Sequence, residues 1–509
     1  MKYLLLTIFG VLIVMSFVAD RLSRKHDDDS KTPLVWVSDG NPARQEQIKI
    51  YNGLYKDNFL QLDPDNGGTM KVIVQCSANM GPDLIDHINE NTFQTYHAAG
   101  VLLDVTDVAP KMGFGLDTLA PTIRPLVQME TIINEKDVNM DDPKDRERLG
   151  DIVLRQYAYP CNVYHTYLFY NKNVFDRLNI PYPKEDLTWD EYIALAKKLT
   201  VMRPGSNIPE VFGAAGVNID TLIWGWEGEH LNKDGTRSAD DSEAVLNAMT
   251  MFHTMMHKDQ VEPSPVLQAG VQAQGGFAAG FISWFGEGKI GMYWGARWML
   301  IQFRRFQEEQ RKAHERWEKD GRQGPEPQVL RYGVINVPHF PGKPIYSQMG
   351  ARNTGINVRS HHREAALTFL QYLASAEYAK IINDDADSKP GNQKYYQLAL
   401  MRNPRFHDDG EEDAHRFAIS NIPNGRCRSR SVFVQQAVID RAFNDVTSKI
   451  KAEPDLTRDD IAKELKNCAT RINKEITRNI KRDPNLRRAY EKMLKKGAEP
   501  IVIPFEEVN

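Results

Sequence analysis

The chain has 509 residues, of which 41% are hydrophobic and 26% are charged, and its formal net charge is -4 at pH 7. This composition is ordinary for a globular protein, and the length allows more than one hydrophobic core. Acidic and basic residues are mixed, without a basic face large enough for nucleic acid, so a nucleic-acid partner is not expected. The sequence therefore predicts a neutral or weakly charged ligand, or a protein partner.

A run of apolar residues from Tyr3 to Ala19 is typical of an export signal or a membrane anchor. Its length is near the lower limit for crossing a bilayer. No cysteine follows that could carry a lipid, the bulky Phe17 fits a cleavage site poorly, and cations follow directly after the run. These features favour an anchor, residues 1–19, over a cleaved signal. Both alternatives predict an exported, periplasmic protein, in which residues 20–33 form a solvated tether rather than a metal site.

Strand and helix signals alternate between Leu34 and Lys380, which predicts an α/β protein. Leu34–Asp39 and Lys71–Gln75 are expected to be the first two strands. A third strand is expected after Gly81-Pro82, followed by a helix.

Residues 164–200 are the most informative stretch of the chain. They read as an aromatic strand, an Asn-Lys-Asn turn, a short helix over Val174–Asn179, a Pro-x-Pro break and a second helix. Thr188 is expected to cap this second helix, because Glu191 follows at the spacing of a capping box. Trp189, inside the helix start, is expected to be a core residue.

The later part of the chain predicts strands at Tyr332–Pro338 and Gly350–Val358 and one helix over Arg363–Lys380. Two charged stretches, Asn139–Asp151 and Gln302–Gly324, read as insertions. The second has an apolar helical face and predicts a surface helix, for which a docking role is the less favoured alternative.

The tail beyond residue 402 is strongly charged and favours helices. One amphipathic helix is expected after Arg430, and another over Asp455–Ile480, with a start near Thr457 and Asp460.

The order of these pieces resembles one family. Tyr170-Asn171-Lys172, the Pro-x-Pro break and Thr188-Trp189-Asp190-Glu191 follow a Gly-Pro-Asp strand start and the phrase Gly100–Thr106, GVLLDVT. This ordered set is similar to extracellular solute-binding proteins of ABC importers, of the sugar-binding, maltose-binding-like group. The resemblance covers about residues 34 to 390.

The resemblance implies an α/β, two-lobed periplasmic-binding-protein fold (type II-like), in which both lobes are built from discontinuous segments. Residues 34–160 and 339–385 are expected in lobe 1, and residues 161–338 and 386–509 in lobe 2, including a helical C-terminal segment. The chain is expected to cross between lobes near Tyr157–Tyr164, near Pro338–Tyr346 and after Ile381. It also implies a monomer that captures a sugar or oligosaccharide and delivers it to ABC transporter permease subunits, without catalytic residues, metal or cofactor.

A sugar site needs aromatic rings for the C–H faces of the sugar and polar groups for its hydroxyls. Such residues surround glycines in two places, where turns are expected to hold them. The expected ligand contacts there are Trp224, Trp226, Glu227, Trp294, Arg297 and Trp298.

Further ligand contacts are expected at the ends of strands, where α/β sheets place their sites. Ser38, Asp39 and Asn41 follow the first strand, although turn formation explains Asp39 and Asn41 equally well. The family resemblance adds Asn89 and Glu90 as hydroxyl-binding groups, and further contacts are expected from Tyr164 and Arg352.

Two other functions stay open. An exported glycan-acting enzyme is the first, but no GxSxG, HExxH or P-loop is present, and Glu227 and Glu229 are alternate residues that point apart instead of facing each other as a glycosidase pair does. A binding protein for a polyamine or an amino acid is the second.

The four cysteines, Cys76, Cys161, Cys427 and Cys468, lack CxxC spacing, so a zinc site is not expected. A Cys427–Cys468 disulfide and free buried thiols are both compatible with the sequence.

Overall fold

The computed structural model describes residues 31–41, 43–63, 68–205, 209–264, 280–406 and 409–508. The expected signal or anchor at residues 1–19 and nearly all of the tether lie outside these residues. Within them, no helix combines the length and the apolar character needed to cross a membrane.

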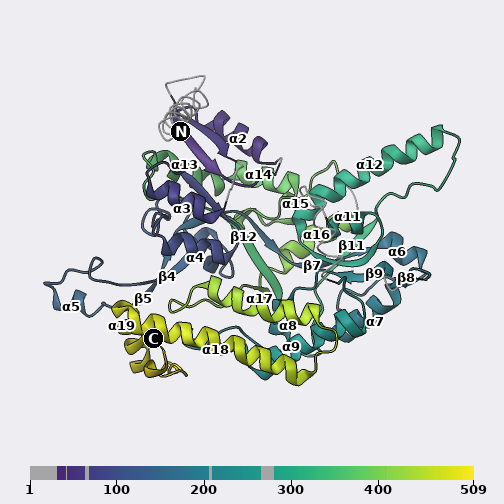
Figure 1. Cartoon of the computed structure of the whole chain (residues 1–509). Coiled ribbons are helices and arrows are strands. Elements are labelled where there is room, and N and C mark those ends of the chain that lie inside the picture. Colours follow the sequence, from purple (N-terminus) through teal and green to yellow (C-terminus); the bar gives the residue numbers. More distant parts are fainter. Residues whose placement is uncertain are drawn as a thin grey trace, which may run out of the picture.

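The first lobe is built on a mixed sheet of six strands, in which β1 lies parallel to both β2 and β3 and the long strand β12 runs antiparallel to β3 and β6. Its strands are β1 (Thr32–Val37), β2 (Asn58–Asp63), β3 (Leu84–His87), β6 (Ala158–His165), β12 (Ser347–Ile356) and β13 (Gly425–Arg426). Its main helices are α2 (Ala43–Leu54), α3 (Thr69–Ser77), α4 (Glu90–Ala98), α13 (Arg363–Leu373) and α14 (Ala376–Asp385) (Figure 1).

The second lobe is built on a sheet of five strands in the order β11-β7-β10-β9-β8. These are β7 (Tyr167–Asn171), β8 (Val201–Met202), β9 (Pro209–Ala215), β10 (Ile290–Gly295) and β11 (Tyr332–Ile335). The helices around it include α6 (Lys172–Arg177), α7 (Trp189–Leu199), α8 (Ile219–Gly225), α9 (Glu243–His253), α11 (Phe281–Gly286) and α16 (Asp409–Ser420).

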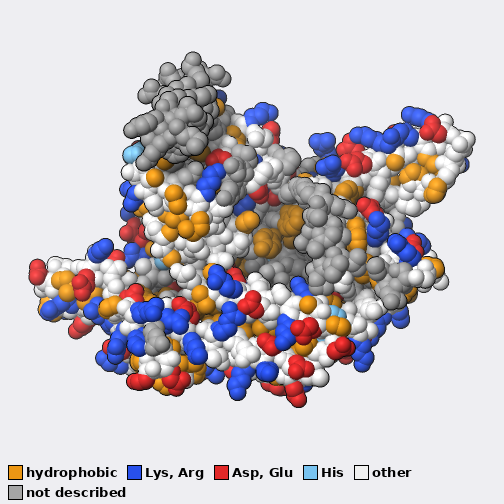
Figure 2. Space-filling view, in the orientation of Figure 1, with side chains coloured by type: hydrophobic (Ala, Val, Ile, Leu, Met, Phe, Trp, Pro, Cys, Tyr) orange, Lys and Arg blue, Asp and Glu red, His pale blue; other side chains and the backbone are white. Residues whose placement is uncertain are grey.

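Two elements project from the lobes on opposite sides of the molecule (Figure 1). Helix α12 (Leu300–Lys319) is anchored by the buried Phe303 and carries charged residues along its outer part, as Figure 2 shows. On the other side, the hairpin of β4 (Gln128–Ile132) and β5 (Ile152–Gln156) carries the short helix α5 (Pro143–Arg146). These are the two stretches that read as insertions.

Among the described residues the chain passes between the two sheets at four places, the last of which leads from α16 to β13 of the first sheet. Thr166 alone separates β6 from β7, and it is fixed because its N–H donates to the carbonyl of Gln348 over 2.9 Å and its carbonyl accepts from Ser347 Oγ at 2.6 Å. Residues 336–346 lead back from β11 to β12, and the chain crosses again between α14 and α16, which packs against β11. Both lobes are therefore discontinuous in sequence.

The C-terminal helices contact both lobes. Helices α17 (Gln436–Ala452), α18 (Arg458–Arg482) and α19 (Pro484–Lys495) run along one side of the molecule (Figure 1). Ile439, Leu465 and Ile472 share one hydrophobic core with the second lobe. On the first lobe, α17 packs against α4, and α19 packs against the hairpin strand β4.

Two predicted elements are corrected by the structure. Lys71–Gln75 is part of helix α3 and not a strand, because Val72 and Cys76, four residues apart, are its buried positions. The second strand is β2 instead. The helix expected over Arg363–Lys380 is two helices, because α13 ends at Leu373 and Ser375 starts α14 as an N-cap that accepts from the N–H of Tyr378.

Other local predictions are confirmed. Thr188 and Glu191 form a reciprocal capping box at the start of α7, and Thr457 and Asp460 do the same at α18. Trp189 is a core residue with 1% of its surface exposed.

Candidate functional site

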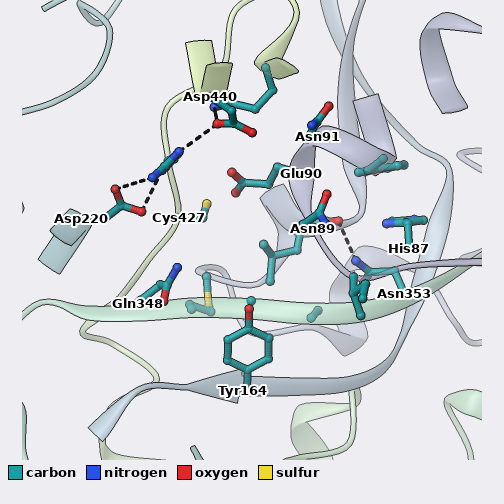
Figure 3. Close-up of a pocket in the computed structure, with 18 of the residues that line it drawn as sticks. His87, Asn89, Glu90, Asn91, Tyr164, Asp220, Gln348, Asn353, Cys427 and Asp440 are labelled. Carbon is teal, nitrogen blue, oxygen red and sulfur yellow. Dashed lines mark hydrogen bonds and ion pairs between the residues drawn. The ribbon is translucent and has the colours of Figure 1, made fainter. Parts of the chain in front are cut away.

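A cavity of about 180 Å³ lies where the two lobes and the C-terminal segment meet (Figure 3). The first lobe supplies the end of β3 and the start of α4, with Tyr164 from β6 and the middle of β12. Helix α8 supplies Asp220 and Trp224 from the second lobe. The lining side chains used below are His87, Asn89, Glu90, Tyr164, Asp220, Trp224, Gln348, Cys427, Arg428 and Asp440.

The floor of the cavity depends on a glycine. Tyr164 of β6 lies across Gly350 of the paired strand β12. A Cβ atom at position 350 would collide with the Tyr164 ring, so this ring can adopt its position only because residue 350 is glycine.

Asn89 and Glu90 enter the cavity because they start helix α4. The Asn89 side chain caps this helix by accepting from the N–H of Thr92 at 2.8 Å. Glu90 is the first helical residue, where a carboxylate is favoured by the helix dipole. Burial raises the pKa of Glu90, and the carboxylates of Asp220 and Asp440 add to this, while the guanidinium groups of Arg430 and Arg428 oppose it.

Arg428 joins two carboxylates of the cavity wall. Its Nε and Nη2 donate to the two oxygens of Asp220, both over 2.8 Å, and its Nη1 donates to Asp440 over 2.9 Å. Oδ1 of Asp220 also lies 3.2 Å from His230 Nε2. Burial opposes ionisation of Asp220, but Arg428 and His230 together hold its pKa well below its usual range.

Two buried aromatic side chains of the lining have nitrogen atoms without a hydrogen-bond partner in the described chain. His87 stacks on Phe93 with ring centroids 4.2 Å apart, and neither of its ring nitrogens is paired. Burial lowers the pKa of His87 to about 3, so the ring is neutral. Trp224 is fully buried, with Arg426 5.6 Å from its ring centroid and its Nε1 unpaired.

A second chamber, also of about 180 Å³, adjoins the first, since Ile88 and Tyr164 line both. Its other lining residues are Asp39, Asn41, Arg44, Asn162, Trp298, Arg352, Asp387 and Ser388. Figure 2 shows the molecular surface hollowed between the two lobes.

The charges of the second chamber are largely paired with one another. Arg44 lies 2.8 Å from Asp39 and 2.7 Å from Asp387. Arg352 donates through Nη1 to Asp86 over 2.7 Å and to Ser38, whereas its Nε and Nη2 make no hydrogen bond. Although Asp39 is desolvated, Arg352 and Arg44 lower its pKa, so it is a carboxylate.

The structure brings most of the predicted site residues to these two chambers. Asn89, Glu90, Tyr164 and Trp224 line the first, and Asp39, Asn41, Tyr164, Trp298 and Arg352 line the second. Ser38 lies behind the second chamber, where it bonds to Asp86 and Arg352.

Trp294 and Arg297 line neither chamber. Trp294 lies in strand β10, stacks on Trp189 at 5.7 Å and donates to Tyr192 Oη over 3.0 Å. Arg297 is fully buried and donates to the carbonyls of Ile382, Asn383, Ser388 and Met401 and to His415. The indole nitrogen of Trp294 and the guanidinium group of Arg297 therefore bond to other protein groups and not to a ligand in either chamber.

Trp226 and Glu227 also lie outside the chambers. Trp226 packs on Phe340 with ring centroids 4.7 Å apart, and Glu227 pairs with Lys343 at 2.8 Å. The prediction of a turn around Trp224 is wrong, because Trp224 lies inside helix α8 and Trp226 is the C-cap of this helix.

Several lining residues were not predicted, notably His87, Asp220, Gln348, Arg428 and Asp440. Arg428 and Asp440 come from the tail, which lies beyond the residues that resemble the family. Three arginines lie close together at residues 426–430. Such a cluster indicates that carboxylates from elsewhere in the chain pack against it.

The four cysteines are free thiols, so the Cys427–Cys468 pairing is not formed. Cys427 lies at the cavity, and Cys468 lies 3.7 Å from Asp240. In the described ranges, no three His, Cys, Asp or Glu side chains are grouped so that they could hold a metal ion.

Fold and cavity together define a two-lobed α/β protein with a polar and aromatic chamber between its lobes. The model of the bacterial extracellular solute-binding proteins matches residues 51–380 of the chain. Since this is well over half of the 509 residues, the chain belongs to that family. The match ends before the tail that supplies Cys427, Arg428 and Asp440.

Solved structures share the fold. An ABC substrate-binding protein from Listeria monocytogenes, in complex with cycloalternan, is 21% identical with a TM-score of 0.63, over 87% of this chain and 98% of that chain. An ABC transporter solute-binding protein from Thermotoga lettingae, bound with alpha-D-tagatose, is 17% identical with a TM-score of 0.63, over 88% and 100%. UgpB from Mycobacterium tuberculosis, in complex with glycerophosphocholine, is 14% identical with a TM-score of 0.59, over 88% and 100%.

Proposed function

We propose that this protein is the substrate-binding component of an ABC importer, which captures a saccharide between its lobes and delivers it to a membrane permease. The observation that carries the proposal is the pair of adjoining chambers between the lobes, lined by amide, carboxylate and guanidinium groups around Tyr164. Hydroxyl groups need such donors and acceptors, and the C–H faces of a sugar pack on aromatic rings. Two of the structural neighbours named above are bound to saccharides.

The size of the chambers favours a ligand of more than one sugar ring. One chamber of about 180 Å³ holds the volume of roughly six water molecules, which is small for a ligand pocket. The two together reach the lower end of the range that encloses a drug-sized ligand, on the order of 300 Å³. The ring of Tyr164 would then lie between the two parts of the ligand.

Binding is proposed to close the lobes without turnover. The passages between the sheets, at Thr166, at residues 336–346 and after α14, are where a hinge would act. A ligand that contacts both lobes favours the closed arrangement, since it binds that arrangement more tightly. The closed, exported protein would then dock on the permease.

A thermal-shift panel tests the ligand class. Mono-, di- and trisaccharides, amino acids, polyamines and glycerophosphodiesters are each added to the purified protein. A saccharide at 100-fold its Kd is expected to stabilise the protein by about 2.7 kcal/mol. Shifts from amino acids or polyamines alone would overturn the saccharide proposal, and release of reducing ends from a glycan would overturn the absence of turnover.

A further inference from the structure

Glu90 is the carboxylate of the first chamber that lacks a basic partner. Its side chain extends into the cavity between Tyr164 and the pair formed by Asp220 and Asp440 (Figure 3). In the part of the chain that the structure describes, no Lys, Arg or His side chain lies within ion-pair distance of it. The thiol of Cys427 lines the same cavity, and burial together with the nearby Glu90 carboxylate raises the pKa of this thiol.

The other two carboxylates of the chamber already have partners. Asp220 is paired with both Arg428 and His230, and Asp440 accepts from Arg428 and from Gln436. Arg430 faces Glu90 from the tail, but it donates to the carbonyl of Pro125 and contacts Met129 Sδ at 3.6 Å. Arg430 therefore offsets part of the charge of Glu90 without touching it, and Glu90 is the carboxylate of the chamber that has no direct ion pair among the described residues.

The chamber contains two further side chains whose polar atoms have no hydrogen-bond partner among the described residues. His87 is 1% exposed and lines the cavity with both ring nitrogens unpaired. Trp224, fully buried in the opposite wall, has an unpaired Nε1. Unpaired buried polar atoms cost free energy, so a polar solute that bonds to them is favoured.

We propose that the solute presents an ammonium group to Glu90, so that the ligand is an amine-bearing saccharide. This inference rests on the proposed function and names the substrate class of the same site. An ammonium has three donors and no acceptor, which suits a wall with an unpaired carboxylate and nearby amide and phenol oxygens.

Burial of Glu90 supports the same assignment. Desolvation raises the pKa of Glu90 and outweighs the opposing effect of Arg430 and Arg428, so the charged form of Glu90 costs free energy when no ligand is bound. A bound cation removes that cost, whereas a neutral sugar does not. A charged hydrogen bond in such a partly buried site is also stronger than a neutral one.

Part of this charge pattern comes from outside the segment that the family model matches. Arg428 and Asp440 belong to the tail, and Arg428 neutralises Asp220 of the second lobe. If Arg428 were absent, three carboxylates would share the chamber. The tail therefore leaves one acidic position, at Glu90, for the ligand.

The test is isothermal titration at neutral pH and low salt with three matched disaccharides. One is built of glucosamine units, one is its N-acetylated form and one is the neutral glucose analogue. The glucosamine disaccharide is expected to bind at least tenfold more tightly than the N-acetylated form. This comparison needs only the natural protein.

Variants assign the preference to Glu90. Glu90→Gln is expected to abolish the tenfold preference, and Glu90→Asp is expected to retain part of it. The control is Glu227→Gln, which removes an exposed carboxylate outside the cavity and is expected to leave the preference intact. Each variant is first checked for an unchanged melting transition.

The outcomes separate the two proposals. Equal or tighter binding of the neutral or N-acetylated disaccharide would overturn the ammonium inference and leave saccharide binding standing. An amine preference that survives in Glu90→Gln would also overturn it. Failure of all three disaccharides and of every other saccharide in the thermal-shift panel would overturn the proposed function itself.

Discussion

His230 lies between two aspartates, with Nδ1 2.7 Å from Asp240 and Nε2 3.2 Å from Asp220. All three side chains are buried, and Asp220 continues the chain of contacts to Arg428 at the cavity. Burial disfavours the charged imidazole, but the two carboxylates outweigh it and raise the pKa of His230 to about 9. Cationic His230 thus holds helix α8 to the 230–240 loop behind the proposed binding site.

The first prediction concerns pH. Because the folded-state pKa of His230 is above its unfolded value of about 6.5, its contribution is complete below that pH and is lost as pH rises through about 9. The contribution is on the order of 3 kcal/mol. Urea unfolding of the natural protein and of His230→Gln should differ most at pH 6 and least at pH 9.5. The exposed His361→Gln serves as a control, and a difference that is constant with pH would contradict a cationic His230.

The second prediction concerns Arg297, which holds the segment around residues 382–401. Removing it leaves several buried carbonyl groups without their donor, each worth about 1–3 kcal/mol. Arg297→Met should lower the free energy of unfolding by at least about 3 kcal/mol. Ligand affinity of the folded fraction should stay unchanged. A loss of affinity without a loss of stability would place Arg297 in the binding site after all.

The third prediction separates two tryptophans on the same helix end. Trp224 is fully buried, so Trp224→Ala should cost about 3–5 kcal/mol of stability. Trp226 is 37% exposed and mainly meets Phe340, so Trp226→Ala should cost only about 1 kcal/mol. Chemical denaturation measures both. Ligand titration of the conservative variant Trp224→Phe then tests the cavity contact, and Trp226→Ala should bind normally.

The fourth prediction concerns a buried lysine at the crossing between the lobes. Lys389 is 1% exposed, and its Nζ lies 2.6 Å from His165 Nδ1. Burial, with Arg297 nearby, holds the pKa of Lys389 well below its usual range. The folded state therefore binds fewer protons than the unfolded chain, and stability is penalised below the unfolded pKa of about 10.4.

Lys389→Met keeps the length of this side chain and removes that penalty. The variant should be more stable than the natural protein at pH 7, by about 1 kcal/mol or more, and the gain should shrink toward pH 10. Thermal unfolding across this pH range measures the effect. A marked destabilisation at pH 7 would show that Lys389 is needed in its present form.

The fifth prediction concerns the floor of the cavity. Gly350→Ala places a methyl group against the Tyr164 ring and should cost about 1–3 kcal/mol of stability while weakening ligand binding. Gly53 provides the matched control, since it lies in helix α2 with open space around it. Gly53→Ala should gain about 0.5–1 kcal/mol and bind normally. Equal behaviour of the two variants would exclude a special role of Gly350.

The sequence alone determined features that depend on near neighbours in the chain. The capping boxes at Thr188 and Thr457 depend on groups three residues apart, and the ordered phrases from Leu34 onward identified the family. Composition and order therefore predicted the α/β class. The same local reasoning failed at Lys71–Gln75, where β-branched residues favour a strand but the burial of Val72 and Cys76 against the first lobe decides for a helix.

Only the tertiary structure decided which polar and aromatic residues share the cavity. Trp294 and Trp224 both follow the pattern of a tryptophan next to glycine, yet one is enclosed by Trp189 and Tyr192 and the other reaches the chamber wall. Asp220 and Arg428 are 208 residues apart and meet because the tail folds back across both lobes. Such contacts depend on how distant elements pack. The local pattern of a sequence does not determine which buried surfaces come into contact.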